Sequence, residues 1–421
     1  MIHFLYNISI YIYAVLIYIA SFFNSKAKLW VDGRKNVFQK IKSQIPNQSF
    51  EIPIIWFHCA SLGEFEQGRT LIEQIKIQNP KVKIILTFFS PSGYEIRKNY
   101  EGADHVFYLP IDTPNNAKQF VELIKPKAVF FIKYEFWFNY LLELKKHEIP
   151  TYLVSGIFRE NHYFFKFYGA WFRKQLKCFT HFYLQSEQSK QMLKEIGYNN
   201  TSVPGDTRFD RVFEISKNVK SYPLIELFKE GKNIFIAGST WPEDEKVLST
   251  LNLPDGQAGF KTLNFKLIIA PHEIDESHIR SIENLFNTKC LRYSQATEKN
   301  VSTADILIID NIGMLSSLYQ YSSIAYIGGG FGKGIHNILE AATFGMPIIF
   351  GPNYQKFSEA IELIQLGGAF SISSKEELKK IFSSLNNSDV IQNTSLISKK
   401  YIASHIGATA KILSSILLPS N

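Results

Sequence analysis

The sequence contains two successive series of short apolar runs, each about as long as a buried β-strand. Helical patterns separate the runs, and strands that alternate with helices are typical of a parallel α/β sheet. The pattern predicts two Rossmann-like, doubly wound domains that face each other across a cleft, with ligands at the carboxyl ends of the strands. The first series lies at 52–57, 82–88, 106–109, 128–132, 151–154 and 181–184, and the second at 233–237, 266–270, 305–309, 324–327 and 347–350.

A polar stretch separates the two series and marks the expected domain boundary. We expect a membrane anchor at 1–28, a first domain at 29–212, a linker at 213–232 and a second domain at 233–421. A chain of 421 residues is long enough for two such domains. For the last helix, packing back against the first domain is an alternative to a place in the second. The segment 253–259 is predicted to be a surface loop.

The N-terminal segment is the expected membrane anchor. The stretch Phe4–Ser25 carries no charged side chain, and its length is close to the roughly 20 apolar residues that cross a bilayer. Lys26, Lys28, Arg34 and Lys35 follow, and by the positive-inside rule they keep the rest of the chain on the cytoplasmic side. Because the segment also contains tyrosine and asparagine, a helix lying in the membrane interface is an alternative, and a buried core helix is a third.

Charge and cysteine content limit the partners and the compartment. The formal charge of +8 fits nucleic acid, an anionic membrane or an anionic substrate. No long basic run or zinc-ligand spacing favours nucleic acid, so we expect no such partner. Cys59, Cys178 and Cys290 are too few and too scattered for a disulfide framework, which indicates a reducing compartment.

A glycine-rich loop at 328–334 follows the apolar run 323–327 and precedes an expected helix start at Asn337–Ala342. A strand, a glycine loop and a helix N-terminus together form an anion site, because free N–H groups and the helix dipole face the ligand. Lys333 is followed by glycine, so the loop is no Walker A motif, and its spacing also differs from G-x-G-x-x-G. The loop predicts a nucleotide or phosphate ligand, with a purely structural turn as the alternative.

In the first domain, the segment His58–Glu64 lies where a strand ends and a helix begins. A glutamate there is placed to take a proton from a hydroxyl nucleophile. Ser61 and Glu64 also form the S-x-x-E pattern of a capping box, in which the carboxylate only accepts a backbone N–H. Both interpretations stay open from the residues alone.

Three further residues of the first domain are candidates for ligand contact. Glu135 and Asn139 follow another strand and are suited to hydrogen-bond a sugar, unless Glu135 only favours a helix dipole. Arg208 is a candidate anion partner, unless it pairs with a neighbouring aspartate. The aromatic and basic stretch 163–174 fits either an anionic membrane or one face of a core.

The second domain offers small and polar residues after its strands. Gly238, Ser239 and Thr240 suit phosphate or carboxylate contact at a helix start, or a simple N-cap. His272 is a candidate contact to a base or phosphate, and Glu340 to ribose hydroxyls, unless it is only an exposed first-turn glutamate. The histidines at 58, 272 and 336 lack metal-ligand spacing, so we predict no metal.

Together these motifs resemble the bacterial Kdo transferases, which attach 3-deoxy-D-manno-octulosonic acid (Kdo) to the lipid A precursor. The resemblance covers almost the whole chain, in order. The family pattern H-x-x-S-x-G-E matches at His58, Ser61, Gly63 and Glu64, which implies that Glu64 is the general base. The family's E-x-E-x-W-P-N is similar to 133–139, where Glu135 and Asn139 match while Lys133 and Phe138 replace the first glutamate and the proline.

The second-domain motifs of the family are also present. The Gly-Ser-Thr motif matches at 238–240, and the A-P-R-H motif is shortened to Ala270–His272, without an arginine. The resemblance implies that CMP-Kdo, the donor substrate, is bound by residues of these and two later motifs: Gly238, Ser239, Thr240, Pro271, His272, Ile312, Gly313, Met314, Asn337, Ile338, Leu339 and Glu340. Met314 stands where the family has glutamate, so only backbone contact is implied there.

The resemblance further implies a GT-B architecture and a metal-free, cofactor-free inverting displacement. Glu64 would deprotonate the acceptor hydroxyl of lipid IVA, the glycine loop would stabilise the departing CMP phosphate, and the enzyme would lie on the cytoplasmic side of the inner membrane among its lipids. Three alternatives remain: a lipid-directed GT-B transferase that uses another nucleotide sugar, a sugar-nucleotide epimerase, which would need no anchor, and a membrane-tethered, non-catalytic sugar-nucleotide binder.

Overall fold

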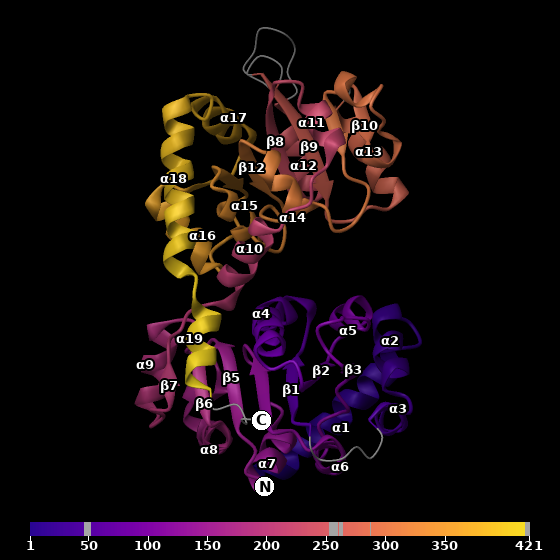
Figure 1. The fold of residues 1–421 in the computed structure, drawn as a ribbon, viewed down its shortest axis with the longest axis vertical. Helices are drawn as coiled ribbons and strands as arrows, with labels where there is room; N and C mark the ends of the chain where they lie inside the picture. The colour runs from indigo at the N-terminus through magenta and orange to yellow at the C-terminus, as the bar shows by residue number, and fades with distance from the viewer. Residues whose placement is uncertain (46–51, 252–259, 261–263, 287, 417–421) are drawn as a thin grey trace. The chain divides into compact units, whose positions relative to one another are not determined.

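The computed structural model describes residues 1–45, 52–251, 260, 264–286 and 288–416, and the loop predicted at 253–259 lies outside them. The chain divides into two compact units, Met1–Arg211 with Ile406–Asn421, and Val212–His405 (Figure 1). The segment predicted as a linker, 213–232, carries regular structure. It contains the last five residues of α10 (Thr207–Lys217) and all of α11 (Pro223–Lys229).

The first unit is built on a parallel sheet of seven strands in the order β3-β2-β1-β4-β5-β6-β7. Both faces are buried, as expected for strands that helices cover on both sides. The strands are β1 (Ile54–Cys59), β2 (Lys83–Phe88), β3 (His105–Tyr108), β4 (Ala128–Ile132), β5 (Thr151–Gly156), β6 (His181–Leu184) and β7 (Thr201–Ser202). Its helices are α1 (Ile2–Ala20), α2 (Ser25–Arg34), α3 (Val37–Gln44), α4 (Leu62–Gln78), α5 (Pro91–Arg97), α6 (Pro114–Ile124), α7 (Phe138–Lys146), α8 (Ala170–Gln175), α9 (Glu187–Glu195) and α19 (Ala408–Ser415).

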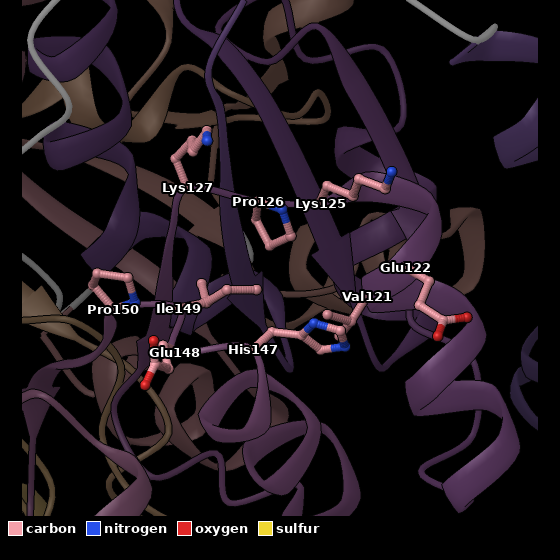
Figure 2. Close-up of a pocket in the computed structure, with 9 residues that line it drawn as sticks. All are labelled: Val121, Glu122, Lys125, Pro126, Lys127, His147, Glu148, Ile149 and Pro150. Atoms are coloured by element: carbon pink, nitrogen blue, oxygen red, sulfur yellow. The ribbon is translucent and has the colours of Figure 1, made fainter. Parts of the chain in front are cut away.

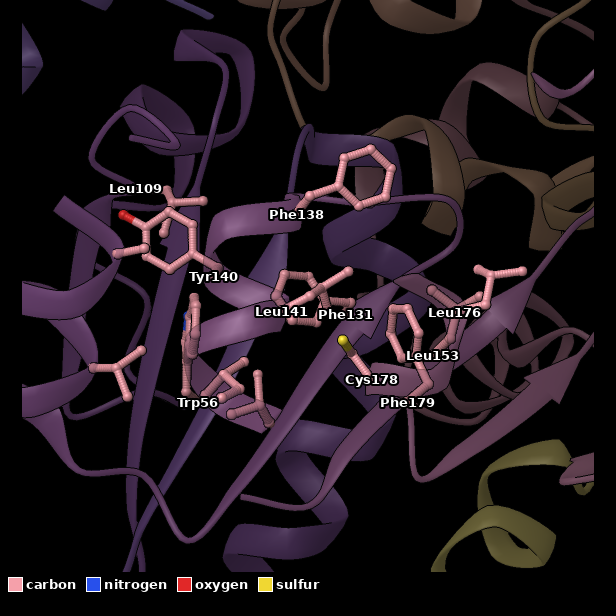
Figure 3. Close-up of a cluster of buried hydrophobic side chains, with 14 of the residues drawn as sticks. Trp56, Leu109, Phe131, Phe138, Tyr140, Leu141, Leu153, Leu176, Cys178 and Phe179 are labelled. Atoms are coloured by element: carbon pink, nitrogen blue, oxygen red, sulfur yellow. The ribbon is translucent and has the colours of Figure 1, made fainter. Parts of the chain in front are cut away.

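Side chains of each strand alternate between two hydrophobic cores. Trp56 and Phe131 belong to one core, together with residues of α7 such as Tyr140 (Figure 3). Phe57 and Phe130 point to the other face and stack with ring centroids 4.7 Å apart. Because both faces of each strand are packed in this way, the ends of the strands have fixed positions. The polar residues that directly follow the strands are therefore also held in fixed positions.

The last helix of the chain, α19, belongs to the first unit. Asp210 accepts hydrogen bonds from the N–H groups of Gly407 and Thr409 at the start of α19. Thr409 also bonds to Thr70 of α4 at 3.0 Å, and Ile412 is buried in the same core as Phe57. The last helix therefore packs against the first domain, which was one of the two positions considered from the sequence.

The second unit has a parallel sheet of its own, in the order β10-β11-β9-β8-β12-β13-β14. Its strands are β8 (Asn233–Thr240), β9 (Phe265–Pro271), β10 (Cys290–Arg292), β11 (Ile306–Ile308), β12 (Ile324–Ile327), β13 (Ile348–Phe350) and β14 (Ala369–Ser371). The helices, besides α11, are α12 (Pro242–Ser249), α13 (Glu276–Phe286), α14 (Leu315–Leu318), α15 (Leu339–Phe344), α16 (Ser358–Leu366), α17 (Lys375–Ser384) and α18 (Ser388–His405).

Each sheet has a point where its strand order reverses. In the first unit it lies between β1 and β4, and in the second between β8 and β12. Helices leave such neighbouring strands toward opposite faces, which opens a crevice at their carboxyl ends. The α/β prediction is therefore confirmed, and the two crevices are the places to look for a site in each unit.

Candidate active site

Glu64 lies in the first turn of α4, directly after the carboxyl end of β1. Its side-chain oxygen accepts the N–H of Ser61 at 3.0 Å, so Glu64 does form the hydrogen bond of a capping box. The residue is nevertheless only 5% exposed. Burial, followed by the negative charge of Glu135, raises the pKa of Glu64 to about 7, while the positive charge of Lys133 opposes the rise. A carboxylate with this pKa is able to accept a proton near neutral pH.

Glu135 follows β4, across the strand-order reversal from Glu64, and is held by a buried network. Trp137 donates its indole N–H to Glu135 at 2.8 Å and to Nε2 of His58 at 3.0 Å. Nδ1 of His58 lies 2.9 Å from the hydroxyl of Thr87. Since Nε2 accepts from the indole, we infer that Nδ1 carries the proton and donates it to Thr87. His58 thus holds the indole of Trp137, which in turn contacts the carboxylate of Glu135.

Lys133 is the first residue after β4, and its backbone has a φ of 72°, which is uncommon for a residue other than glycine. Its N–H still donates to the carbonyl of Val154 at 2.8 Å, so the turn begins directly at the end of the sheet. Burial lowers the pKa of Lys133, and the negative charge of Glu64 acts against this. The ammonium group is the local counter-charge of the carboxylate pair.

Among the other predicted site residues of the first unit, Gly63 faces open space, whereas Arg208 and Asn139 already contact other residues of the protein. Gly63 is exposed, and a Cβ added there would meet no atom within 4 Å. Arg208 forms an ion pair with Asp206 at 2.7 Å, which was the alternative to its role as an anion partner. Asn139 is buried, and its amide contacts α1 and the carbonyl of Asp112. For Asn139 and Arg208, contact with an acceptor stays a prediction.

In the second unit, Gly238–Thr240 ends β8 at a local irregularity of the pairing with β9. Ser239 there has a φ of 54°. Asp244 of the following helix, which the sequence did not single out, joins this turn to the glycine loop. Its carboxylate accepts the N–H groups of Trp241 and Gly329 at 2.9 and 2.8 Å.

The glycine loop is packed more tightly than an open phosphate cradle. A Cβ on Gly328 would lie 2.2 Å from the carbonyl oxygen of Ser239, so packing alone requires glycine there. The N–H groups of Gly328, Gly329, Gly332 and Gly334 all donate to acceptors within the unit. The expectation that this loop as a whole offers free N–H groups is therefore wrong, because the unit itself already uses these four.

The helix expected at Asn337–Ala342 is displaced by two residues. α15 spans only Leu339–Phe344, and Asn337 accepts the N–H of Leu339 at 3.1 Å from outside it. The Asn337 amide also donates to Glu340 at 3.1 Å. The remaining predicted residues Ile338, Ile312, Gly313 and Met314 lie around the starts of α15 and α14, and Ile312 is 90% exposed.

His272 stacks on two rings that contact each other. Its ring centroid lies 4.6 Å from that of Trp241 and 4.5 Å from that of His336, and Trp241 donates its indole N–H to Nε2 of His336 at 3.1 Å. Burial, aided by the charge of His272, lowers the pKa of His336 to about 4, so that ring is neutral near pH 7. The stack joins segments that follow β8, β9 and β12, which are neighbours in the sheet. The predicted donor-site residues of the second unit thus gather at one edge.

A pocket of about 400 Å³ lies elsewhere on the first unit (Figure 2). Residues 125–127 and 147–150 line it, and they precede β4 and β5, so the pocket is at the amino ends of the strands. Glu122, Glu143 and His147 beside it are the one group in the described residues whose ligand atoms are close enough to hold a metal ion. Neither feature involves the residues around Glu64.

Two solved structures share the fold of this chain. A UDP-GlcNAc 2-epimerase from Neisseria meningitidis, bound to UDP-GlcNAc, aligns with a TM-score of 0.61 at 15% identity, over 86% of this chain and 98% of that one. MurG from Acinetobacter baumannii aligns with a TM-score of 0.53 at 12% identity, over 86% and 98%. At these identities the likeness shows the fold alone, which is GT-B.

Sequence comparison assigns the family. Residues 33–211 match the family described as 3-deoxy-D-manno-octulosonic-acid transferase (kdotransferase). A 3-deoxy-D-manno-octulosonic acid transferase of Rickettsia bellii is 30% identical over 363 residues, which are 83% of this chain and 84% of the relative. The chain therefore belongs to the family of the 3-deoxy-D-manno-octulosonic acid transferases.

Proposed function

We propose that this protein transfers Kdo from CMP-Kdo to a lipid A precursor such as lipid IVA, in lipopolysaccharide biosynthesis. Membership of the Kdo transferase family supports the transferred sugar and the class of reaction. The observation that carries the mechanism is the buried carboxylate of Glu64, whose pKa of about 7 suits a general base. It lies at the strand-order reversal, where α/β folds bind ligands.

The proposed chemistry is a single displacement. The acceptor hydroxyl attacks the anomeric carbon of Kdo on the face opposite CMP, and its proton passes to Glu64. The bond between the anomeric carbon and the CMP phosphate oxygen breaks as the new glycosidic bond forms, so the configuration inverts. Lys133 lowers the pKa of Glu64 and keeps a larger fraction of it ionised and ready to accept the proton.

The proposed donor site is the carboxyl edge of the second sheet. Asn337 and Glu340 are suited to hydrogen-bond the ribose of CMP, and the start of α15 to receive its phosphate. The stack of Trp241, His272 and His336 offers a flat aromatic surface for a pyrimidine ring. Backbone groups of 312–314 would complete the site.

The proposed acceptor site is the carboxyl edge of the first sheet. A lipid A precursor carries phosphates, which pair well with arginine and lysine. The positive charges of Arg159 and Arg208 act on Lys133, the counter-charge of Glu64, so three cations gather in this part of the first unit. Because the acceptor is a lipid, we place the enzyme at the cytoplasmic side of the inner membrane. α1 is the one helix of the described residues that is long and apolar enough to cross a bilayer.

We propose that the reaction needs no metal or other cofactor, since the residues around Glu64 supply the base and the counter-charge for it. Transfer is expected to proceed at an unchanged rate after dialysis against EDTA. A loss of activity that Mg²⁺ or Zn²⁺ restores would contradict this part of the proposal.

The assignment is tested by the donor that the purified protein uses. Detergent-dispersed lipid IVA is offered with CMP-Kdo, or in parallel with UDP-GlcNAc and UDP-glucose, and products are identified by mass spectrometry. We expect a product heavier by Kdo with CMP-Kdo alone. Transfer from a UDP-sugar would identify another lipid-directed transferase, epimerised UDP-GlcNAc would identify an epimerase, and donor binding without any product would favour a non-catalytic binder.

A further inference from the structure

The N-terminal helix α1 packs against the first unit from His3 to Ile17. Residues 3, 6, 7, 10, 14 and 17 are covered at least in part, whereas all its other residues are exposed. Positions three and four apart share one helix face, so a single face is covered from the first turn to the last. A helix that leaves its domain to cross a bilayer would be covered only near the end joined to the domain.

Polar side chains dock the first half of this face. Nε2 of His3 lies 2.9 Å from Oδ1 of Asn139, and the Asn139 amide donates to Oδ1 of Asn7 at 3.0 Å. Tyr6 donates its hydroxyl to the buried carboxylate of Asp112, which also accepts the first N–H groups of α7. If α1 left the unit to enter lipid, these buried partners would lose their hydrogen bonds.

Tyr13, which lies at the border of the covered face and is 41% exposed, makes ring contacts in the second half of α1. The Tyr13 ring packs against Trp30 and Phe89, with centroids 6.1 Å apart in both pairs. Phe89 in turn packs on Trp137 at 4.5 Å, the residue whose indole bonds to Glu135. Phe89 follows β2 and Trp137 follows β4, so α1 is seated at the carboxyl edge of the sheet, beside the candidate active site.

The outward face of α1 is apolar, and its surroundings are apolar and basic. Trp171, which packs on His3, follows directly after a segment that exposes Phe167 (95%) and Tyr168. Exposed lysines at 26 and 28 follow the helix. The exposed apolar side chains of the face and of the turn after it are Phe4, Leu5, Ile8, Ile12, Val15, Leu16, Ile19, Phe22 and Phe23.

We propose that α1 lies in the interface of an anionic bilayer, with this outward face among the acyl chains, and does not span it. The apolar face, the flanking lysines and the nearby exposed aromatics are the composition of an interfacial helix. The inference rests on the membrane association in the proposed function and adds its geometry. It places the carboxyl edge with Glu64 at the membrane surface, where a lipid acceptor reaches it without leaving the bilayer.

Positions that lie close together along α1 but on different faces of the helix distinguish an interfacial from a spanning helix. Single cysteines are introduced as Ile12→Cys, Ala14→Cys, Leu16→Cys and Ile17→Cys in a Cys290→Ser background, because Cys59 and Cys178 are buried. Nitroxide labels on the protein bound to anionic vesicles report contact with dissolved oxygen. We expect strong lipid contact at 12 and 16 and shielding at 14 and 17. Equal lipid contact at all four positions would establish a spanning helix and overturn the proposal.

Vesicle flotation tests whether the partner of the outward face of α1 is an anionic bilayer. Ile12→Asp combined with Leu16→Asp is expected to lower binding to vesicles with anionic lipid at least tenfold, and Lys26→Gln with Lys28→Gln on the order of tenfold. Ile77→Asp, at an apolar residue of α4 that is also exposed, is the control and should bind as wild type. Wild type that fails to bind vesicles, or that buries α1 in a dimer instead, would overturn the proposal. Transfer to detergent-dispersed acceptor is measured alongside, so a failure of the proposed function is seen separately.

Discussion

Single residues decide how the site responds to pH. Glu64 has a folded-state pKa of about 7, above the ordinary value for glutamate, because it is buried beside Glu135. A general base works only when deprotonated, so the rate of transfer should fall as the pH drops through about 7. Glu135 and Lys133 act on this pKa in opposite directions, which makes them a natural pair of probes.

Glu135→Gln removes a negative charge near Glu64 and should lower the pKa of Glu64, so the acidic limb of the kcat/KM profile moves to lower pH. Lys133→Met removes a positive charge and should move the same limb to higher pH. The measurement is kcat/KM against pH for both variants. Glu187→Gln, an exposed glutamate on α9, is the control and should leave the limb in place. Shifts in the same direction for both probes would contradict the assignment.

Gly63→Ala tests whether the open space beside Glu64 binds the acceptor, without lowering the stability of the fold. Gly63 lies in the first turn of α4, and an added Cβ meets no protein atom within 4 Å. Alanine there should leave the free energy of unfolding unchanged or raise it by up to about 1 kcal/mol, since alanine favours a helix. If the open space beside Glu64 receives the acceptor, KM for lipid IVA rises several-fold. Unchanged KM would remove this place from the acceptor site.

The sequence was sufficient to find the residues that follow strand ends, such as His58, Glu64 and Glu135, because a parallel sheet brings those ends to one edge. Thr87, Trp137 and Asp244 were missed, since their hydrogen bonds cross between strands whose order the sequence does not state. Thr87, a polar residue near the end of the apolar run 82–88, was a usable signal for a buried network.

At the scale of elements, the turn after β8 and the glycine loop after β12 form one packed unit. Gly328→Ala would place a Cβ against the backbone of Ser239 and Thr240, where nothing is free to move aside. We expect a loss of at least about 2 kcal/mol in unfolding free energy and weaker CMP binding. Gly332→Ala in the same loop is the control, because its nearest contact is 3.6 Å away. Equal stability of the two variants in chemical denaturation would contradict this account.

Apolar pattern predicted the central strands well and the edges poorly. Three strands were missed, β7, β10 and β14, which have two or three residues each and lie at sheet edges. Edge strands are covered on fewer sides and need no apolar run. The start of α15 was placed two residues early, because Asn337 caps the helix from outside instead of opening it.

At the scale of the whole chain, the return of α19 completes the first unit. Ile412→Ala should lower the unfolding free energy of that unit by about 2–4 kcal/mol, since Ile412 is fully buried. Tryptophan fluorescence during denaturation is the measurement, because Trp30, Trp56, Trp137 and Trp171 all belong to this unit. Lys411→Ala, exposed on the same helix, should have little effect. Equal midpoints for the two variants would show that α19 contributes little to the unit.

The central claim is that Glu64 is the base of a Kdo transfer. Glu64→Gln tests it most directly, because glutamine is also a capping-box residue and keeps the N-terminus of α4 intact. The measurement is transfer from CMP-Kdo to lipid IVA by wild type and variant, with CMP-Kdo binding and the melting temperature of both. We predict a loss of transfer on the order of 10²–10⁴-fold, with binding and melting unchanged. Transfer by Glu64→Gln at the wild-type rate would contradict the account.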